Sequence, residues 1–335
     1  MQAVTFPAAL LAAITLLTFP HYGLANPPAQ ATFNLRLDND LLGGLEQDQG
    51  YSHGFLLQWA TGELAQPHVP SKAQRYLAWL QPQAFTSHRL VFSARQMLFT
   101  PEDRQAQEVV RNDRPFVGAL LFGAAYATRQ QNTLRVTQLN LGMVGPDTKS
   151  KQFQHAWHDA FGVERFQGWR NQLRNEPVLQ LVHEQRTRPW QRHLGQHWRT
   201  DAIYHAGVSL GNYATYVNTG VEWRIGMRLP DDLGSSALRP AGDNLLSGAV
   251  NAAWRAHVFV ALDMRWVLRD ITLDGNTFQR SHRVEKRAFV ADVAYGVAAE
   301  KGPWRVAFSR YQRSQEFVGQ KERPVYGSVS VARRF

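Results

Sequence analysis

The stretch that decides the fold runs from Phe33 to Trp59 and reads FNLRLDNDLLGGLEQDQGYSHGFLLQW. Apolar and polar residues alternate at its start, with Phe33, Leu35 and Leu37 on one face, and they alternate again at its end. Successive side chains of a β-strand point to opposite faces, so both ends are expected to be strands. The acid-rich segment between them predicts a hairpin tip. If the first strand keeps its phase, Asp40 lies on its polar face.

The same alternation recurs along the chain, most clearly in Val217–Arg228 and His257–Leu268. The polar face of the first of these carries charges such as Glu222 and Arg224. In a soluble all-β fold that face would meet water. In an outer-membrane barrel the apolar face meets lipid and the charged face lines the lumen. Strands long enough for a tilted crossing, with Trp and Tyr near their ends, favour the barrel.

We therefore predict an all-β fold, a transmembrane antiparallel β-barrel of about twelve strands with a short helix in an extracellular loop. Two connections on the inner side, 62–87 and 229–254, are longer than inner turns usually are. The alternation also slips between Val136 and Leu139, which predicts a β-bulge there. The predicted strands span residues 31–39, 52–61, 88–98, 114–127, 132–144, 176–187, 200–210, 215–228, 255–268, 286–299, 303–312 and 325–335.

Residues 1–25 are expected to be a signal peptide and residues 26–335 the barrel, because an apolar run precedes the small-residue site Gly23-Leu24-Ala25. The missing Lys or Arg near the start leaves a single membrane-anchor helix as the alternative. The chain of 335 residues has no cysteine, which excludes disulfides and thiolate metal sites. Its net charge of +10 suggests an anionic partner. The basic residues are spread singly, so we expect no nucleic-acid binding.

Unusual polar motifs gather in the predicted outer connections. Residues 151–161 have helical character, and Gln154 and His158 are four apart, so they share a face. In chain order the motifs are Asn39-Asp40, Asp48-Gln-Gly-Tyr51-Ser52-His-Gly54, Asp113-Arg114-Pro115-Phe116, Gly142-Met-Val-Gly145-Pro146, Gln154-His-Ala-Trp-His158 and Gly168-Trp169-Arg-Asn-Gln172. Their order and spacing over residues 33–177 resemble the outer-membrane lipid A 3′-O-deacylase family.

This resemblance implies a twelve-stranded barrel that removes the 3′-linked acyloxyacyl chain of lipid A. It makes His158 the general base, Asp40 the ligand of a Ca²⁺ ion, and Asn39 and Ser52 adjacent catalytic-site residues. The residue types suit this chemistry, because ester hydrolysis needs a base of near-neutral pKa. A hard cation held by oxygen ligands can stabilise the oxyanion.

Family members can carry lysines in the second outer loop, where this chain has Arg104, Arg111 and Arg114. We predict that these arginines bind substrate phosphate, since guanidinium groups can do so bidentately. For Asp113 and Arg114 we favour a structural ion pair inside the lumen. The expected partners are lipopolysaccharide and the outer membrane, with the site of an integral multi-pass monomer facing the cell exterior.

Simpler interpretations stand beside these. Asp40 could be a turn residue and His158 an ordinary loop histidine. Ser52 could be a nucleophile activated by His158, as in serine-type outer-membrane phospholipases. We prefer activated water, because the family commonly has Thr at this position. A non-enzymatic porin or adhesin is the remaining alternative.

Overall fold

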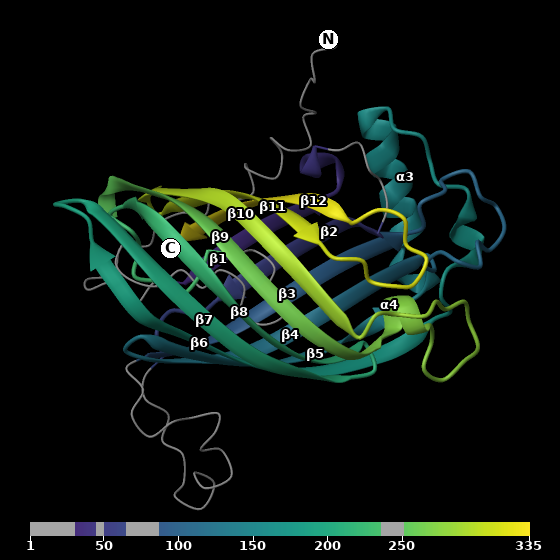
Figure 1. The fold of residues 1–335 in the computed structure, drawn as a ribbon, viewed down its shortest axis with the longest axis horizontal. Coiled ribbons are helices and arrows are strands. Elements are labelled where there is room, and N and C mark those ends of the chain that lie inside the picture. The colour runs from purple at the N-terminus through teal and green to yellow at the C-terminus, as the bar shows by residue number, and fades with distance from the viewer. Residues whose placement is uncertain (1–30, 45–49, 65–86, 236–250) are drawn as a thin grey trace, which may run out of the picture.

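The computed structural model describes residues 31–44, 50–64, 87–235 and 251–335. The expected signal peptide lies outside these residues. In the part described, twelve strands form a closed antiparallel barrel, in which each strand pairs with its sequence neighbours and β1 closes against β12 (Figure 1). The strands are β1 (Thr32–Asn39), β2 (Gly50–Ala60), β3 (Ser87–Thr100), β4 (Val117–Gln130), β5 (Thr133–Val144), β6 (Glu176–His193), β7 (Trp198–Gly211), β8 (Ala214–Met227), β9 (Asn251–Asp270), β10 (Phe289–Gly302), β11 (Trp304–Arg313) and β12 (Val325–Arg334). Every predicted strand is confirmed.

Five short helices lie in the connections described. They are η1 (Leu41–Gly43), η2 (Pro146–Thr148), α3 (Ser150–Phe161), η3 (Gly168–Asn171) and α4 (Ile271–Asp274). All five follow odd-numbered strands, so they share one end of the barrel, which we call the loop end (Figure 1). The opposite end, where β1 begins and β12 ends, we call the turn end. None of these helices is long and apolar enough to cross a membrane.

The polar face of each strand lines the lumen, as the alternation predicts. In β8, Asn218, Glu222 and Arg224 are buried, whereas Val217 and Trp223 are each 49% exposed on the outside. An apolar outer surface with a charged interior is the arrangement of a membrane barrel rather than of a soluble β-fold. The soluble alternative is therefore excluded.

The bulge predicted in β5 is wrong. β5 pairs with β4 and β6 without any register shift from Thr133 to Val144. Leu134 and Val136 lie on the lumen face and are apolar because they pack against Leu233. The alternation of apolar and polar residues slips because the lumen-facing side chains change from apolar, at Leu134 and Val136, to polar, at Gln138 and Asn140. The backbone itself keeps its phase.

The long inner connection after β8 folds into the barrel at the turn end. Its Asp232 carboxylate forms ion pairs with Arg224 of β8 and with Arg305 of β11. Three residues further along, Ser235 N–H donates to Glu222 at 2.6 Å. Leu233 packs against β2 to β6, on the other side of the lumen. Residues 229–235 therefore cross the barrel interior and brace its walls.

We expect Asp232→Ala to lower the free energy of unfolding by about 3 kcal/mol, because it leaves two buried guanidinium groups without a shared carboxylate. The matched control is Asp231→Ala. Asp231 pairs with Arg129 and Arg188, but its side chain is 60% exposed, so the loss there should stay below about 1 kcal/mol. Denaturant unfolding in detergent measures both. Equal losses in the two variants would mean that the segment does not brace the barrel.

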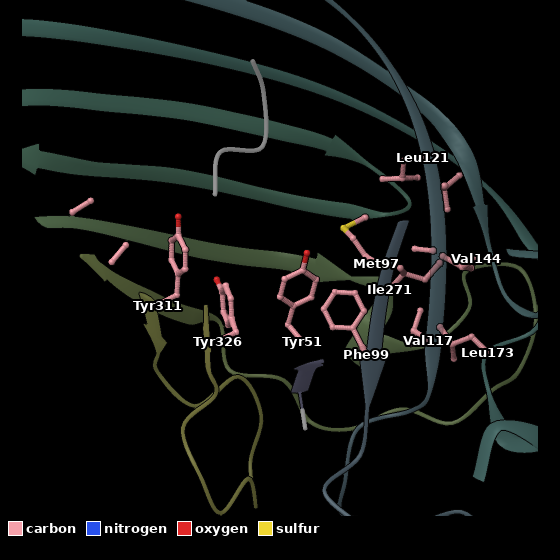
Figure 2. Close-up of a cluster of buried hydrophobic side chains, with 14 residues drawn as sticks. Tyr51, Met97, Phe99, Val117, Leu121, Val144, Leu173, Ile271, Tyr311 and Tyr326 are labelled. Atoms are coloured by element: carbon pink, nitrogen blue, oxygen red, sulfur yellow. The ribbon is translucent and has the colours of Figure 1, made fainter. Parts of the chain in front are cut away.

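An aromatic layer fills the lumen near the loop end. Figure 2 shows Tyr311, Tyr326, Tyr51 and Phe99 side by side, from β11, β12, β2 and β3. Tyr311 stacks on Tyr326 at 4.9 Å between ring centroids, and Tyr51 meets Tyr326 edge-on at 5.1 Å. The Tyr51 hydroxyl donates to Asp38 at 2.8 Å. This layer packs against the lumen side of the β1–β2 hairpin and makes that wall rigid.

Candidate active site

Four residues of adjacent strands form one row across the outer wall at the loop end. Asn39 pairs with His53, His53 with Leu98, and Leu98 with Gly118, from β1, β2, β3 and β4 in turn. Their strand neighbours Tyr51, Met97 and Phe99 point into the lumen. By the alternation of side chains, the row itself faces outward. All four residues are nevertheless buried, so something covers this part of the wall.

The connection between β5 and β6 provides that cover. Phe166 and Trp169 pack on Leu98, and Ser150 at the start of α3 lies where a Cβ on Gly118 would clash at 2.4 Å. Glycine at position 118 is therefore what lets α3 approach the wall. Phe166 and Trp169 of this connection pack on the outward-facing Leu98, whereas Leu173 of the same connection belongs to the buried cluster that contains the aromatic layer.

Helix α3 turns one polar face toward the wall, and Gly162 in left-handed conformation ends it. Ser150, Gln154 and His158 are its buried residues. The Trp169 indole N–H donates to Gln154 Oε1 at 2.6 Å, which ties the helix to the aromatic cluster on Leu98. The predicted helix and the predicted shared face of Gln154 and His158 are both confirmed. Trp169 packs on Phe116, and Tyr51 packs on Phe99.

The imidazole of His158 has one nitrogen fixed by the backbone. Its Nδ1 lies 2.6 Å from the carbonyl oxygen of Glu164, and a carbonyl can only accept, so Nδ1 carries the hydrogen. In the neutral ring Nε2 is then the basic nitrogen. The ring also lies 5.9 Å from Phe166, over which the Arg104 guanidinium is placed. His158 is thus buried and oriented, as a general base needs to be.

The side-chain oxygens of Asn39 and Asp40 lie side by side, because both accept from the same backbone N–H. Asn39 Oδ1 and Asp40 Oδ1 each lie 2.9 Å from the amide nitrogen of Leu41. Asp40 has helical backbone angles and caps η1, so β1 ends at Asn39. The strand phase therefore does not extend to Asp40, and the lumen orientation predicted from that phase has no basis. Asp40 is not among the residues that line the lumen cavity.

The two side-chain oxygens suit a hard cation in type, but the set is small. A carboxylate and an amide oxygen are ligands that Ca²⁺ accepts. Among the described residues, no group of three or more His, Cys, Asp or Glu is placed to hold a metal ion. Asp48, the other acid of the hairpin motif, lies outside the described residues.

Ser52 is the extra residue of a β-bulge between β2 and β3, because the register shifts between Tyr51 and His53. Its hydroxyl lies 3.4 Å from the Leu98 carbonyl and is buried. Bulges often lie next to active sites, where they redirect side chains. This bulge allows Tyr51 to enter the lumen while His53 faces the helix.

The three arginines have different surroundings. The Arg104 guanidinium lies over the Phe166 ring, 5.9 Å from its centroid, and Arg111 is exposed. Arg114 is buried and donates to Glu316 and to Thr272 at 3.0 Å each. The expected ion pair with Asp113 is wrong, because Glu316 from another loop is the partner.

Neighbouring charges and burial shift the pKa values of Glu316, Asp159 and His155 at the loop end. Burial alone raises the pKa of Glu316, but Arg114 and Arg313 hold that pKa below its ordinary value. Beside His158, the hydrogen bond from Arg165 lowers the pKa of the exposed Asp159. Burial lowers the pKa of His155 on the same helix. The lowered pKa values of Glu316 and Asp159 keep both carboxylates charged near neutral pH.

Sequence reasoning missed His53, which contacts both the Asn39 side chain and helix α3. Its Nδ1 lies 3.2 Å from Asn39 Nδ2, and its ring lies 4.8 Å from each of the Phe153 and Trp157 rings. The register of the β1–β2 hairpin places it opposite Asn39. That pairing could have been found from the sequence only with the hairpin register known.

A family model described as outer membrane protein LpxR matches residues 9–335. Among solved structures, LpxR from Salmonella typhimurium is similar, with a TM-score of 0.73 at 18% sequence identity, over 91% of this chain and 100% of that chain. The β domain of a Bordetella autotransporter (9% identity, 91% of this chain, 98% of that chain) and an outer membrane channel of Pseudomonas putida F1 (10%, 95% and 100%) each reach a TM-score of 0.44. No curated protein sequence matches the chain. Because the family match extends over nearly the whole chain, the protein belongs to the LpxR family of outer-membrane lipid A deacylases.

Proposed function

We propose that this chain performs the 3′-O-deacylation of lipid A that its family implies, with His158 as general base and Asp40 as metal ligand. The observation that supports this most is the outward row on β1 to β4. It places Asn39 and Asp40 beside the wall that helix α3 covers, and α3 carries His158.

His158 and the Glu164 carbonyl have separate roles in the proposed ester hydrolysis. His158 Nε2 takes a proton from water, while the Glu164 carbonyl holds Nδ1–H and supports the positive charge that forms. The oxygen of that water attacks the ester carbonyl carbon. The bond to the sugar 3′ oxygen then breaks, and His158 returns its proton to that oxygen. A Ca²⁺ ion held by Asp40 and Asn39 oxygens would polarise the ester carbonyl.

The outer position of this site suits a substrate embedded in a membrane. Below the row, Leu57, Trp59 and Phe92 point outward and are exposed, as lipid-facing side chains are. Acyl chains can lie along this surface while the sugar stays at the level of α3. Arg104, which lies over the Phe166 ring, and the exposed Arg111 are our proposed contacts for substrate phosphate. We assign the loop end to the cell exterior, where lipid A resides.

Ser52 as a nucleophile is the second mechanism, and one substitution separates it from activated water. We expect Ser52→Ala to retain activity within about tenfold of wild type, because the hydroxyl contacts the Leu98 carbonyl and serves the bulge. Removing a true serine nucleophile costs about 10⁶-fold in kcat. Ser52→Thr, which keeps a hydroxyl at this position, should also stay active if water is the nucleophile. A collapse of activity in Ser52→Ala, with the barrel still folded, would establish Ser52 as the nucleophile.

A competition assay tests the function itself. The purified barrel is incubated with calcium in mixed micelles of lipid A and phospholipid, and both lipid pools are analysed. Loss of one acyloxyacyl chain from lipid A alone is expected. Hydrolysis of phospholipid would favour a phospholipase, and no hydrolysis by a folded barrel would favour a porin or adhesin. The segment 229–235 across the lumen already makes an open pore a poor fit.

A further inference from the structure

His53 contacts both Asn39 on the barrel wall and helix α3, which carries His158. It is 3% exposed, although it faces the outside of the barrel. Its ring packs at 4.8 Å on both Phe153 and Trp157, which lie one turn apart on α3. Aromatic pairs at this separation contribute packing energy and fix ring orientation. The barrel wall thus holds α3 through a histidine that no other step of the mechanism uses.

The hydrogen bonds of Asn39 identify which side-chain atom is the amide oxygen and which is the nitrogen. Its Nδ2 donates to the Ser52 carbonyl at 3.0 Å, and its Oδ1 accepts from the Leu41 N–H at 2.9 Å. A carbonyl cannot donate and an N–H cannot accept, so the amide cannot be flipped. His53 Nδ1 is therefore facing a donor at 3.2 Å and must accept. The ring is neutral, with its hydrogen on Nε2.

We propose that His53 is a positioning residue, which accepts the second N–H of Asn39 so that Asn39 Oδ1 stays beside Asp40 Oδ1. The same histidine holds helix α3 against the barrel wall through Phe153 and Trp157. With both Nδ2 hydrogens engaged, the Asn39 amide cannot rotate freely, and its oxygen stays beside Asp40 Oδ1. Partners that orient metal ligands in this way commonly change metal affinity by about 10- to 100-fold when removed. This inference rests on the proposed metal role of Asn39 and Asp40.

Two substitutions separate the acceptor from the ring. His53→Phe keeps an aromatic ring for Phe153 and Trp157 but cannot accept from Asn39. His53→Asn keeps an oxygen near the place of Nδ1 but has no ring. We expect His53→Phe to raise the calcium dissociation constant of the full-length barrel by about 10- to 100-fold. We expect His53→Asn to stay within about threefold of wild type, since the hydrogen bond to Asn39 can still form.

Calorimetric titration of calcium into the detergent-solubilised protein gives this constant without relying on activity. Proteolysis at Lys151 and Arg165 reports whether α3 remains docked. It should be faster in His53→Asn than in His53→Phe. If wild type binds calcium and deacylates lipid A while His53→Phe binds calcium equally well, His53 does not position the ligand, and the proposed function stands. If wild type binds no calcium, the metal role fails, and this inference fails with it.

Discussion

Replacing His158 with alanine is expected to lower kcat/KM for lipid A deacylation by about 10²- to 10⁴-fold, the range that general-base catalysis supplies. The side chain is buried and its Nδ1 is held by the Glu164 carbonyl, so its Nε2 keeps one orientation. Alanine removes the base without touching the barrel strands. Steady-state hydrolysis of lipid A in detergent micelles measures the effect, and heat-modified migration on gels confirms that the barrel is folded.

The control for this result is the same substitution at His193, an exposed residue at the turn end of β6. His193→Ala should keep full activity. His158→Gln is a second test, because it fills the same space without a basic nitrogen, and it should be as inactive as His158→Ala. If either His158 variant retained activity within a few fold of wild type, the general base would be another residue.

Removing the cation or its carboxylate should be as damaging. We expect Asp40→Ala to lower kcat by at least about 100-fold, because the loss of a group that stabilises the oxyanion typically costs 10²- to 10³-fold. A chelator should silence the wild-type enzyme to a similar extent, and added calcium should restore it. Asp40→Ala should not recover at the calcium concentration that restores wild type, since its main ligand is missing.

Asp147→Ala is the matched control for Asp40. Asp147 is an exposed acid at the same end of the barrel and bonds to Asn175 outside the proposed site. It should keep both activity and its calcium response. If the chelator left wild type active while Asp40→Ala was inactive, Asp40 would act through structure, through its cap on η1. Activity in both cases would remove the metal from the mechanism.

The barrel could be predicted because alternation is a local property. A strand with one lipid face and one lumen face must alternate apolar and polar residues, whichever strands it pairs with. Each strand can therefore be recognised from its own sequence. The segment 229–235 could not be predicted, because its contacts depend on which walls face each other across the lumen. The false bulge in β5 has the same origin, since Leu134 and Val136 are apolar only to meet Leu233.

The sequence motifs supplied candidate site residues but not the contacts among them. Motif order indicated Asn39, Asp40 and His158, but the alternation was extended one residue too far at Asp40, where the backbone becomes helical. Arg114 was paired with its sequence neighbour, whereas Glu316, 202 positions away, is its partner. His53 carried no motif of its own. In each case the deciding contact joins segments that are distant in the sequence.

The central claim is that a carboxylate on the barrel wall and an imidazole on α3 act on one ester of lipid A. Mass spectrometry of lipid A from cells that express wild type, Asp40→Ala or His158→Ala tests it most directly. The account predicts that wild type removes the 3′-linked acyloxyacyl chain and no other, and that each variant, folded in the outer membrane, leaves lipid A intact. Loss of a different chain, or the same 3′ loss in either variant, would contradict it.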